Sequence, residues 1–318
     1  MFRFIIRRVV AMIPLLVLIS ILTFSLMHLL PGDPALAILG EQLSAANNQE
    51  AYESLREELG LNDPLPIQYL NWASRAVQGN FGTSIRNNTS IGQTIAHHAF
   101  PTIELAILGF LVAIVIAVPA GVVSALKPNS PTDVAATVAA LSGLAVPNFF
   151  LGVLLIYVFS IWLRVLPPSG YVPPWENLGE NLKLMVMPAL TIGTSLAAIL
   201  MRQIRSALLE VLQQDYIRTA RSKGLDQQAV VLRHAFKNAL IPVVTIIGQQ
   251  LGTLIGGAVI TETIFSIPGM GRMIVDSIFF RDFPVVQAAV LVLSLSVLVA
   301  NLLTDLAYGF LDPRIRHE

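Results

Sequence analysis

Long apolar runs constrain this chain of 318 residues more than any other feature. Several of them exceed eighteen residues, about the length that a helix needs to cross the hydrocarbon core of a bilayer. Over the whole chain 54% of residues are hydrophobic and only 13% are charged, a balance typical of membrane proteins. The sequence therefore predicts an all-α polytopic membrane protein, not a soluble domain.

Six helices are expected to span the membrane, at about residues 9–30, 102–126, 134–163, 184–201, 239–260 and 285–310. The first follows a basic start (Arg3, Arg7 and Arg8), as a signal peptide would. Its apolar run is longer than that of a signal peptide, and no small-residue cleavage site follows it. We interpret it as a retained helix. The third span is long enough to tilt or bend at Pro147.

The distribution of charge predicts the orientation. Residues 202–237 hold seven Lys and Arg residues against three acids, although the formal net charge of the chain is zero. Because Lys and Arg gather in cytoplasmic segments, this segment and both termini are placed in the cytoplasm. The neutral total gives no reason to expect a nucleic-acid partner. Cysteine is absent, which excludes disulfides and thiolate metal sites.

Three parts of the chain are expected. Residues 1–30 form the N-terminus and first span, residues 31–100 an exterior cap, and residues 101–318 the core, with a cytoplasmic segment at 202–242. In the cap, the PGDP turn precedes two amphipathic helices, at about 48–59 and within IQYLNWASRAV, before the turn GNFG. We expect a compact cap, with Tyr69, Trp72 and Phe81 against the membrane rim. Residues 261–284, around Pro268-Gly269-Met270-Gly271, are expected to form a short hairpin or embedded turn at the outer mouth.

Ionisable residues within the predicted spans are scarce. His28, Glu104 and Asp305 all lie near helix ends, where an interfacial or packing role is expected rather than an ion or proton site. Adjacent His97 and His98 would point about 100° apart on a helix and chelate a metal poorly. No catalytic motif or phosphate-binding loop occurs, so any driving energy must come from a partner.

Three glycines of the fifth span, Gly248, Gly252 and Gly256, share one helix face. Small residues at that spacing let two helices approach closely. Ordinary helix packing is the expected role, and a sliding or dimer contact is the alternative.

The basic segment reads as a series of helices. The fourth span should continue to about residue 213, and a second helix should run from Asp215 to Lys223. Gly224 should end that helix in a left-handed conformation, with Asp226 as the N-cap of the next. One face of this next helix carries Leu225, Ala229, Leu232 and Phe236, rimmed by Arg221, Lys223 and Arg233.

Such a short amphipathic helix between two turns suits a groove on another protein; the alternative is a helix lying on the membrane surface. Pro242 should open the fifth span.

The pattern DYIRTARSKGL…HAFKNALIPVV resembles the EAA loop of importer-type ABC permeases, in the version found in the dipeptide/oligopeptide/nickel permease family. Arg218-Thr219-Ala220 stand where the general pattern has Glu-Ala-Ala, Gly224 matches its glycine, and residues 239–242 match its I-x-L-P ending. Arginine replaces the glutamate, and the gap after Gly224 is longer than in sugar permeases. The segments HLLPGDPA, LGLNDPLPIQYLNW, GNFGTS, ETIFSIPGMGR, RDFPVVQ and DPRIR extend the resemblance over nearly the whole chain.

This resemblance implies a type I importer permease fold in the bacterial inner membrane. It also implies a second, homologous permease as heterodimer partner, two cytoplasmic ATPases and an extracytoplasmic solute-binding protein. ATP and Mg²⁺ would bind the ATPases, and this chain would hold no cofactor and catalyse no reaction. The residues expected to couple to the ATPases are Arg218, Thr219, Ala220, Gly224, Leu225, Ala229, Leu232, Arg233 and Phe236. Those expected at the exterior gate or binding-protein contact are Pro268, Gly269, Gly271 and Arg272.

The expected function is ATP-driven import of di- or oligopeptides or a related small solute. The alternative is a carrier or channel that works alone, which would need a charged or unwound site in mid-membrane. An intramembrane enzyme would need a nucleophile and base at helical spacing, and none is seen. The sequence leaves the substrate open among dipeptides, longer peptides, glutathione-like compounds and nickel chelates.

Overall fold

The computed structural model describes residues 2–29, 49–58 and 61–311. These residues are mostly helical, and they contain no strand beyond a single bridge between Thr83 and Ser90. The elements are α1 (Phe2–Leu29), α3 (Gln49–Glu58), α4 (Leu65–Val77), α5 (Ile91–Leu126), α6 (Pro131–Ala145), α7 (Asn148–Leu155), the π-helical segment η1 (Ile156–Trp162), α8 (Leu178–Leu212), α9 (Asp215–Ser222), α10 (Gln227–Ala229), the π-helical segment η2 (Val230–Ala235), α11 (Phe236–Ile264), α12 (Met270–Phe279) and α13 (Phe283–Leu311).

Helix α8 is the centre of the core, and α5 packs along it. Glycines bring the two helices together: a Cβ on Gly109 would overlap Ile192, and a Cβ on Gly121 would overlap Ile204. A Cβ on Gly193 would in turn meet the carbonyl of Gly109 at 2.6 Å. Small residues therefore set the separation of these helices, as is usual where two helices meet in a membrane.

Four helices of the described residues are long and apolar enough to cross a membrane, namely α1, α5, α8 and α13. Two bent pairs raise the number to six if each pair is one span. One pair is α6 with α7 and η1, which meet at an angle of 102°. Val146 and Pro147 are extended at this break, because proline has no amide hydrogen to donate and disfavours a helical residue before it. The bend expected at Pro147 is confirmed.

The second bent pair corrects an expectation about the fifth span. Pro242 lies inside α11 rather than at its start, and the helix axis bends by 48° between the segments Gln227–Leu240 and Pro242–Gln250. The chain is helical from Gln227 through η2 into α11, so no turn separates the short basic helix from the span. A proline inside a helix removes one backbone hydrogen bond and produces a bend.

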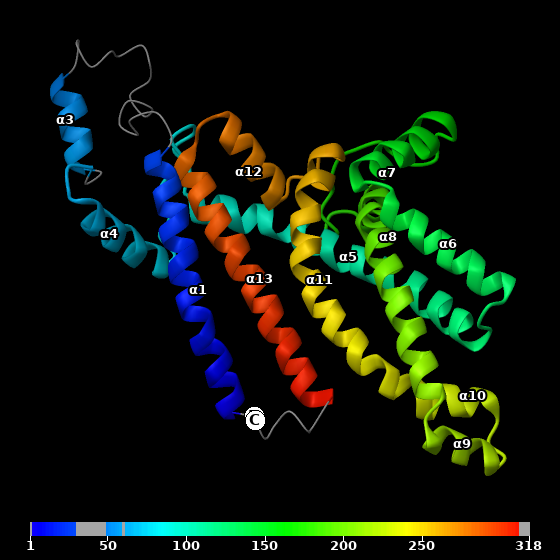
Figure 1. The fold of residues 1–318 in the computed structure, drawn as a ribbon. Helices are drawn as coiled ribbons and strands as arrows, with labels where there is room; N and C mark the ends of the chain where they lie inside the picture. The colour runs from blue at the N-terminus through cyan, green and yellow to red at the C-terminus, as the bar shows by residue number, and fades with distance from the viewer. Residues whose placement is uncertain (1, 30–48, 59–60, 312–318) are drawn as a thin grey trace.

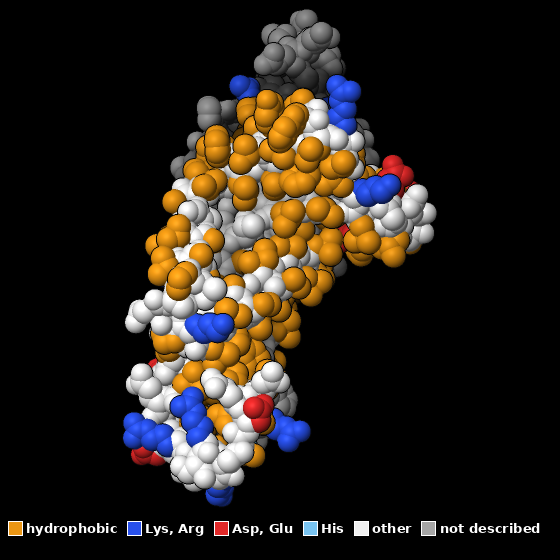
Figure 2. Space-filling model, turned by 90° about the vertical axis from the view of Figure 1, so that its right-hand side faces the viewer, with side chains coloured by type: hydrophobic (Ala, Val, Ile, Leu, Met, Phe, Trp, Pro, Cys, Tyr) orange, Lys and Arg blue, Asp and Glu red, His pale blue; other side chains and the backbone are white. Residues whose placement is uncertain are grey.

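The helices divide the molecule into two ends (Figure 1). The first turn of α1, the last turn of α13 and the pair α9–α10 lie at one end, and α12 lies at the other. This arrangement agrees with the relative topology expected from the apolar runs. Apolar side chains cover much of the face seen in Figure 2, whereas Lys, Arg, Asp and Glu side chains gather at the end that contains α9 and α10.

The described part of the segment between the first two spans forms an arm and not the compact cap that was expected. Figure 1 shows α3 and α4 as an arm beside α1, and α4 contacts α1 through Tyr69 and Trp72, whose rings pack on Phe24. The Tyr69 hydroxyl also lies 2.8 Å from Ser20 Oγ. Phe81 packs separately, against a cluster formed by α5, α12 and α13. The PGDP turn lies outside the described residues.

The glycine face of α11 packs against α13. A Cβ on Gly248 would overlap Thr304, and one on Gly252 would lie 3.3 Å from Val297 Cγ1. A Cβ on Gly256 would meet nothing within 4 Å. Two of the three glycines therefore serve helix packing within the chain, the role expected of them.

Candidate functional site

The basic end of the molecule is built on α9, whose inner face is apolar. Ile217 and Ala220 are buried against Leu208 of α8 and against Val230 and Ala235 of η2. A hydrogen bond from Asn238 Nδ2 to the Tyr216 hydroxyl (2.9 Å) ties α9 to α11. These contacts hold α9 firmly and turn its other face to solvent.

The predicted turn after α9 is confirmed. Gly224 has φ +78°, and the carboxylate of Asp226 accepts a hydrogen bond from the amide of Gln228 (3.1 Å), as an N-cap does. A Cβ on Gly224 would meet nothing within 4 Å. Glycine is therefore required here by the left-handed backbone and not by lack of space.

The helix after the turn packs on the core through residues outside the expected docking face and leaves both leucines of that face exposed. Val230, Val231 and Ala235 are buried, whereas Leu225 and Leu232 are 43% and 65% exposed. Two apolar faces compete for the core along this short stretch, and only packing against α8 and α9 decides between them. Leu225 and Leu232 are thus free to contact another protein, which the core-facing residues are not.

The other residues of the expected coupling set divide in the same way. Arg218, Thr219 and Arg233 are exposed, Ala220 is buried beneath them, and Ala229 and Phe236 are half-buried. Arg218 pairs weakly with Asp215, at 3.5 Å, on the solvent face of α9. We call the exposed residues Arg218, Thr219, Arg221, Lys223, Leu225, Leu232 and Arg233 the basic surface.

An ion pair that sequence reasoning missed lies on the core side of the basic surface. Arg205 of α8 donates from Nε and Nη2 to the two carboxylate oxygens of Asp133, both at 2.7 Å. Asp133 is buried in the first turn of α6 and also accepts from the amide of Asn129 and from Ser124 Oγ. The network fixes the connection between α5 and α6 to the part of α8 that leads into α9. Arg205 and Asp133 are far apart in the sequence, so no local motif predicts this ion pair.

At the opposite end, the turn between α11 and α12 closes around a buried carboxylate. Glu262 is fully buried and accepts from Thr102 Oγ1 (2.6 Å) and from the amide of Arg272 (3.0 Å). Thr102 Oγ1 in turn accepts from the amide of Met270 (2.8 Å). Sequence reasoning placed Glu262 in the exterior loop and found no buried acid, so this site is a correction. The carboxylate stabilises the turn by satisfying amides at the start of α12.

The four residues expected at the exterior gate form this turn. A Cβ on Gly269 would overlap the Glu262 carboxylate, and one on Gly271 would lie 2.5 Å from Val259 Cα. Pro268 is half-buried, and Arg272 pairs with Asp276 at 3.7 Å. The segment is thus a tight turn followed by the helix α12, which agrees with the embedded turn expected here and not with the alternative of a hairpin.

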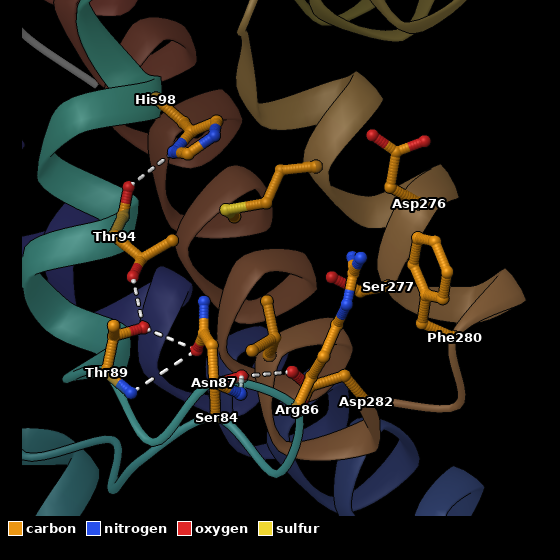
Figure 3. A pocket seen from close by; sticks show the side chains of 12 residues that line it. Ser84, Arg86, Asn87, Thr89, Thr94, His98, Asp276, Ser277, Phe280 and Asp282 are labelled. Atoms are coloured by element: carbon orange, nitrogen blue, oxygen red, sulfur yellow. Dashed lines mark hydrogen bonds between the residues drawn. The ribbon is translucent and has the colours of Figure 1, made fainter.

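A polar hollow of about 180 Å³ lies beside α12 (Figure 3). On one side the Arg86 guanidinium stacks on the ring of Phe280, 3.5 Å from its centroid. On the other side Thr89 Oγ1 donates to Asn87 Oδ1 (2.7 Å), and Thr89 lies within hydrogen-bonding distance of Thr94. At its floor Asp282 accepts from the Ser84 hydroxyl and from the amide of Ile85.

The hollow connects three elements and presents charge to solvent. Asp282 joins the loop at residues 82–90 to the start of α13, while Arg86 and Asp276 are exposed at its mouth. Within the described part of the chain no three His, Asp or Glu side chains are grouped to hold a metal ion. The arrangement suits polar contact with another molecule.

The remaining ionisable residues of the spans add no site. The Tyr171 hydroxyl donates to Glu104 Oε2 (2.7 Å), which supports the packing role expected of Glu104. Burial and the neighbouring Glu104 raise the pKa of Tyr171 above its ordinary value. The side chains of His28 and Asp305 lie outside the described residues.

Solved structures show the fold of this chain in other proteins. An inward-facing structure of the MetNI methionine ABC transporter matches with a TM-score of 0.57 at 17% identity, over 69% of this chain and 97% of that one. An amino acid ABC transporter solved with histidines matches with a TM-score of 0.51 at 14% identity, over 68% of this chain and 93% of that one. The fold is that of the membrane subunit of a type I ABC importer.

Sequence comparison then places the chain in a family. Residues 117–317 match the model of the binding-protein-dependent transport system inner membrane component, and residues 1–106 match the model of its N-terminal region. The chain belongs to this family of binding-protein-dependent permeases. It is therefore a transport subunit of the inner membrane and not an enzyme, and it works with an ATPase and a binding protein.

Individual relatives match over the full length. A putative peptide permease protein of Brucella suis is 41% identical over 319 residues, 99% of each chain. The dipeptide transport system permease protein DppB of Alkalihalophilus pseudofirmus is 41% identical over 337 residues, all of each chain. The glutathione transport system permease protein GsiC of Escherichia coli K12 is 39% identical over 318 residues, again all of each chain.

Proposed function

We propose that this chain forms one half of the membrane channel of a peptide-importing ABC transporter. The full-length similarity to DppB carries the proposal, because both chains are covered completely at 41% identity. The solutes named for the relatives, dipeptides and glutathione, are both short and contain peptide bonds. The substrate class is accordingly short peptides. The other half of the channel is a second, different permease of the same family.

The basic surface is the docking site for the ATPases in this proposal. It combines exposed cations with the exposed leucines Leu225 and Leu232, and a docked helix would bury both leucines. Closure of the ATPases on ATP and Mg²⁺ would push α9, and the continuous helix from Gln227 into α11 would transmit the movement to the membrane. This places the basic surface and both termini in the cytoplasm, consistent with its surplus of Lys and Arg.

At the exterior end, the α11–α12 turn and α12 would receive the binding protein and close the outer mouth. Pro268, Gly269, Gly271 and Arg272 form the rigid turn at the base of α12, and Ile278 and Phe279 are exposed at its far end. Exposed apolar residues at a helix end suit a protein contact.

Reconstitution of the purified complex tests the proposal. Proteoliposomes that contain this chain, its partner permease and the ATPases should accumulate labelled dialanine, tetra-alanine or glutathione only with ATP and the loaded binding protein. Liposomes that hold this chain without ATPases are the control. Uptake by the chain alone would show a stand-alone carrier instead, and a complex that transports none of the three probes would refute the peptide assignment.

A further inference from the structure

A second cavity, partly open at the surface of the chain, lies beside the break between α6 and α7. Its volume is about 60 Å³. Three of its lining side chains are polar and uncharged: Asn148 at the first position of α7, Ser195 of α8 and Gln250 of α11. The rest of the lining is apolar or glycine and comprises Ile192, Leu196, Ile199, Leu254 and Gly257.

The cavity lies at the middle of the two long helices that line it, α8 and α11. Ser195 is seventeen residues from either end of α8, and Gln250 is fourteen residues from either end of α11. Both helices are elongated elements of the membrane core, so their midpoints lie far from either water-facing end. The 102° break beside Pro147 brings the start of α7 to the same level. Unwound backbone at this depth is tolerated where it lines a cavity.

The polar groups of the cavity are only partly used by the protein. Ser195 Oγ donates to Asn148 Oδ1 at 2.5 Å, which leaves the Asn148 amide hydrogens on Nδ2. A Cβ on Gly257 would lie 3.7 Å from Asn148 Nδ2, so glycine leaves space beside that amide. The side chain of Gln250 makes no hydrogen bond to any described residue. An amide without a partner in an apolar setting costs about 1–3 kcal/mol, so these groups are placed to meet water or a passing solute.

The chemistry of the lining selects among possible solutes. No lining residue is ionisable, so the cavity offers no counter-charge to the ends of a peptide. Asn and Gln each present a donor and an acceptor, as a peptide bond does, and can pair with it at both positions. The volume of about 60 Å³ is far below the roughly 300 Å³ or more of ordinary ligand pockets, so this chain alone would receive one such group and not a whole dipeptide.

We propose that Asn148, Ser195 and Gln250 are this chain's contribution to a solute-contact site midway along the transport path, and that the site recognises backbone amides of the passing peptide. The inference rests on the proposed function, and the second permease would complete the site from the opposite side. Movement about the α6–α7 break would widen the cavity during transport.

Uptake by the reconstituted complex is the first test, with dialanine, tetra-alanine and glutathione as probes. Gln250→Met and Asn148→Leu keep the volume and remove the amides. We expect each to lower the rate of uptake about tenfold, the equivalent of one lost hydrogen bond, while ATP hydrolysis stimulated by the binding protein persists. Thr194→Val is the matched control, because the Thr194 hydroxyl already donates to the Leu190 carbonyl within α8 (2.9 Å). Unchanged uptake in both amide variants would overturn the inference, whereas absence of uptake by the wild type would count against the proposed function instead.

The assignment to amides has its own comparison. In alanyl-lactate an ester replaces the peptide bond and removes its N–H donor. The advantage of the wild type over Gln250→Met should shrink for this analogue relative to dialanine. An equal advantage for both compounds would show that Gln250 does not contact the amide.

A labelling experiment gives a readout that does not depend on uptake. Because the chain contains no cysteine, Asn148→Cys and Gln250→Cys introduce unique thiols in it. A water-soluble methanethiosulfonate reagent attacks the thiolate, which forms only where water reaches the group. We expect both variants in the intact complex to react at least about tenfold faster than Thr191→Cys, at a fully buried position of α8, and a high concentration of transported dialanine to slow them. Failure of both to react, even while the transporter hydrolyses ATP, would show that the cavity is dry packing.

Discussion

At the scale of single residues, backbone conformation and exposure decide which positions of the basic surface matter. Gly224 needs its left-handed φ of +78° although it has open space around it, whereas Leu232 has 65% of its surface exposed. The effect of substituting Gly224 should therefore depend on the backbone conformations that the new residue allows. Substitution of Leu232 should have an effect only when a partner is bound.

Gly224→Val should misdirect the turn between α9 and α10. A β-branched residue resists the left-handed conformation by about 1–2 kcal/mol, whereas Gly224→Asn, which tolerates it, is the matched control. We expect the valine variant to insert in the membrane and bind ATPases but to lose coupled uptake, measured as peptide transported per ATP hydrolysed. Normal coupling in the valine variant would show that the turn geometry is not transmitted.

Leu232→Asp should act on the partner instead of the fold. Burial of an unpaired carboxylate in a docked interface costs about 2 kcal/mol or more, some thirtyfold in affinity. Pull-down of the ATPases and uptake should both fall, while the thermal stability of the isolated chain is unchanged. Gln228→Glu, at another exposed position outside the basic surface, gives the comparison for added charge. Retention of the ATPases at wild-type strength by Leu232→Asp would place the docking site elsewhere.

At the scale of elements, two polar anchors fix how helices meet. Arg205 and Asp133 join α8 to the start of α6, and Glu262 joins the α11–α12 turn to Thr102 of α5. Each anchor connects two helices at the end where a partner is proposed to bind. Weakening an anchor should loosen that end without unfolding the other.

Arg205→Ala should leave a buried carboxylate without its cation and destabilise the chain by about 3–5 kcal/mol. The double variant Arg205→Ala with Asp133→Asn should recover part of this loss, because it removes the uncompensated charge. Arg202→Ala, an exposed neighbour on α8, is the control. Thermal unfolding of the detergent-solubilised complex measures all of them, and a single Arg205→Ala variant as stable as Arg202→Ala would refute the anchor.

Gly269→Ala should disturb the exterior turn, since its Cβ would overlap the Glu262 carboxylate. Overpacking of this kind costs about 1–3 kcal/mol and should lower the response of ATP hydrolysis to the loaded binding protein. Gly256→Ala is the matched control. Gly256 lies in α11, the helix that precedes this turn, and a Cβ there would meet no described atom within 4 Å. An alanine at Gly269 with a full response to the binding protein would mean that the turn does not sense it.

At the scale of the whole molecule, the helices place the basic surface and α12 at opposite ends (Figure 1). The proposed orientation puts the first in the cytoplasm and the second outside. The distribution of Lys and Arg residues between the two sides of the bilayer sets the orientation of the chain. Labelling with a reagent that cannot cross the membrane measures this orientation.

Labelling of single cysteines in intact cells should settle the orientation in this cysteine-free chain. Phe279→Cys, at a position 80% exposed on α12, should react with an impermeant thiol reagent from outside, and Gln228→Cys should react only after the membrane is opened. Asn88 is a poorer exterior probe, because its φ of +54° favours asparagine over cysteine. Reaction of Gln228→Cys in sealed cells would reverse the topology.

The sequence by itself determined the features that depend on neighbouring residues. The apolar runs predict the membrane helices because a helix satisfies its own backbone hydrogen bonds in lipid. Gly224 and Asp226 define the turn after α9, and Pro147 the break before α7, through backbone preferences that act over one or two residues.

Only the tertiary structure decided which groups meet across the fold. Glu262 and Thr102 are 160 residues apart, Arg205 and Asp133 are 72 apart, and Ser195 and Asn148 are 47 apart. The sequence also could not decide which face of the helix after Gly224 packs on the core. The structure buries Val230 and Ala235 and leaves Leu232 exposed. Helix rotation and separation fix these pairs, and both depend on the small residues and side chains of two helices at once. The spacing of apolar residues along one helix shows that the helix has an apolar face. It does not show which other helix or protein covers that face.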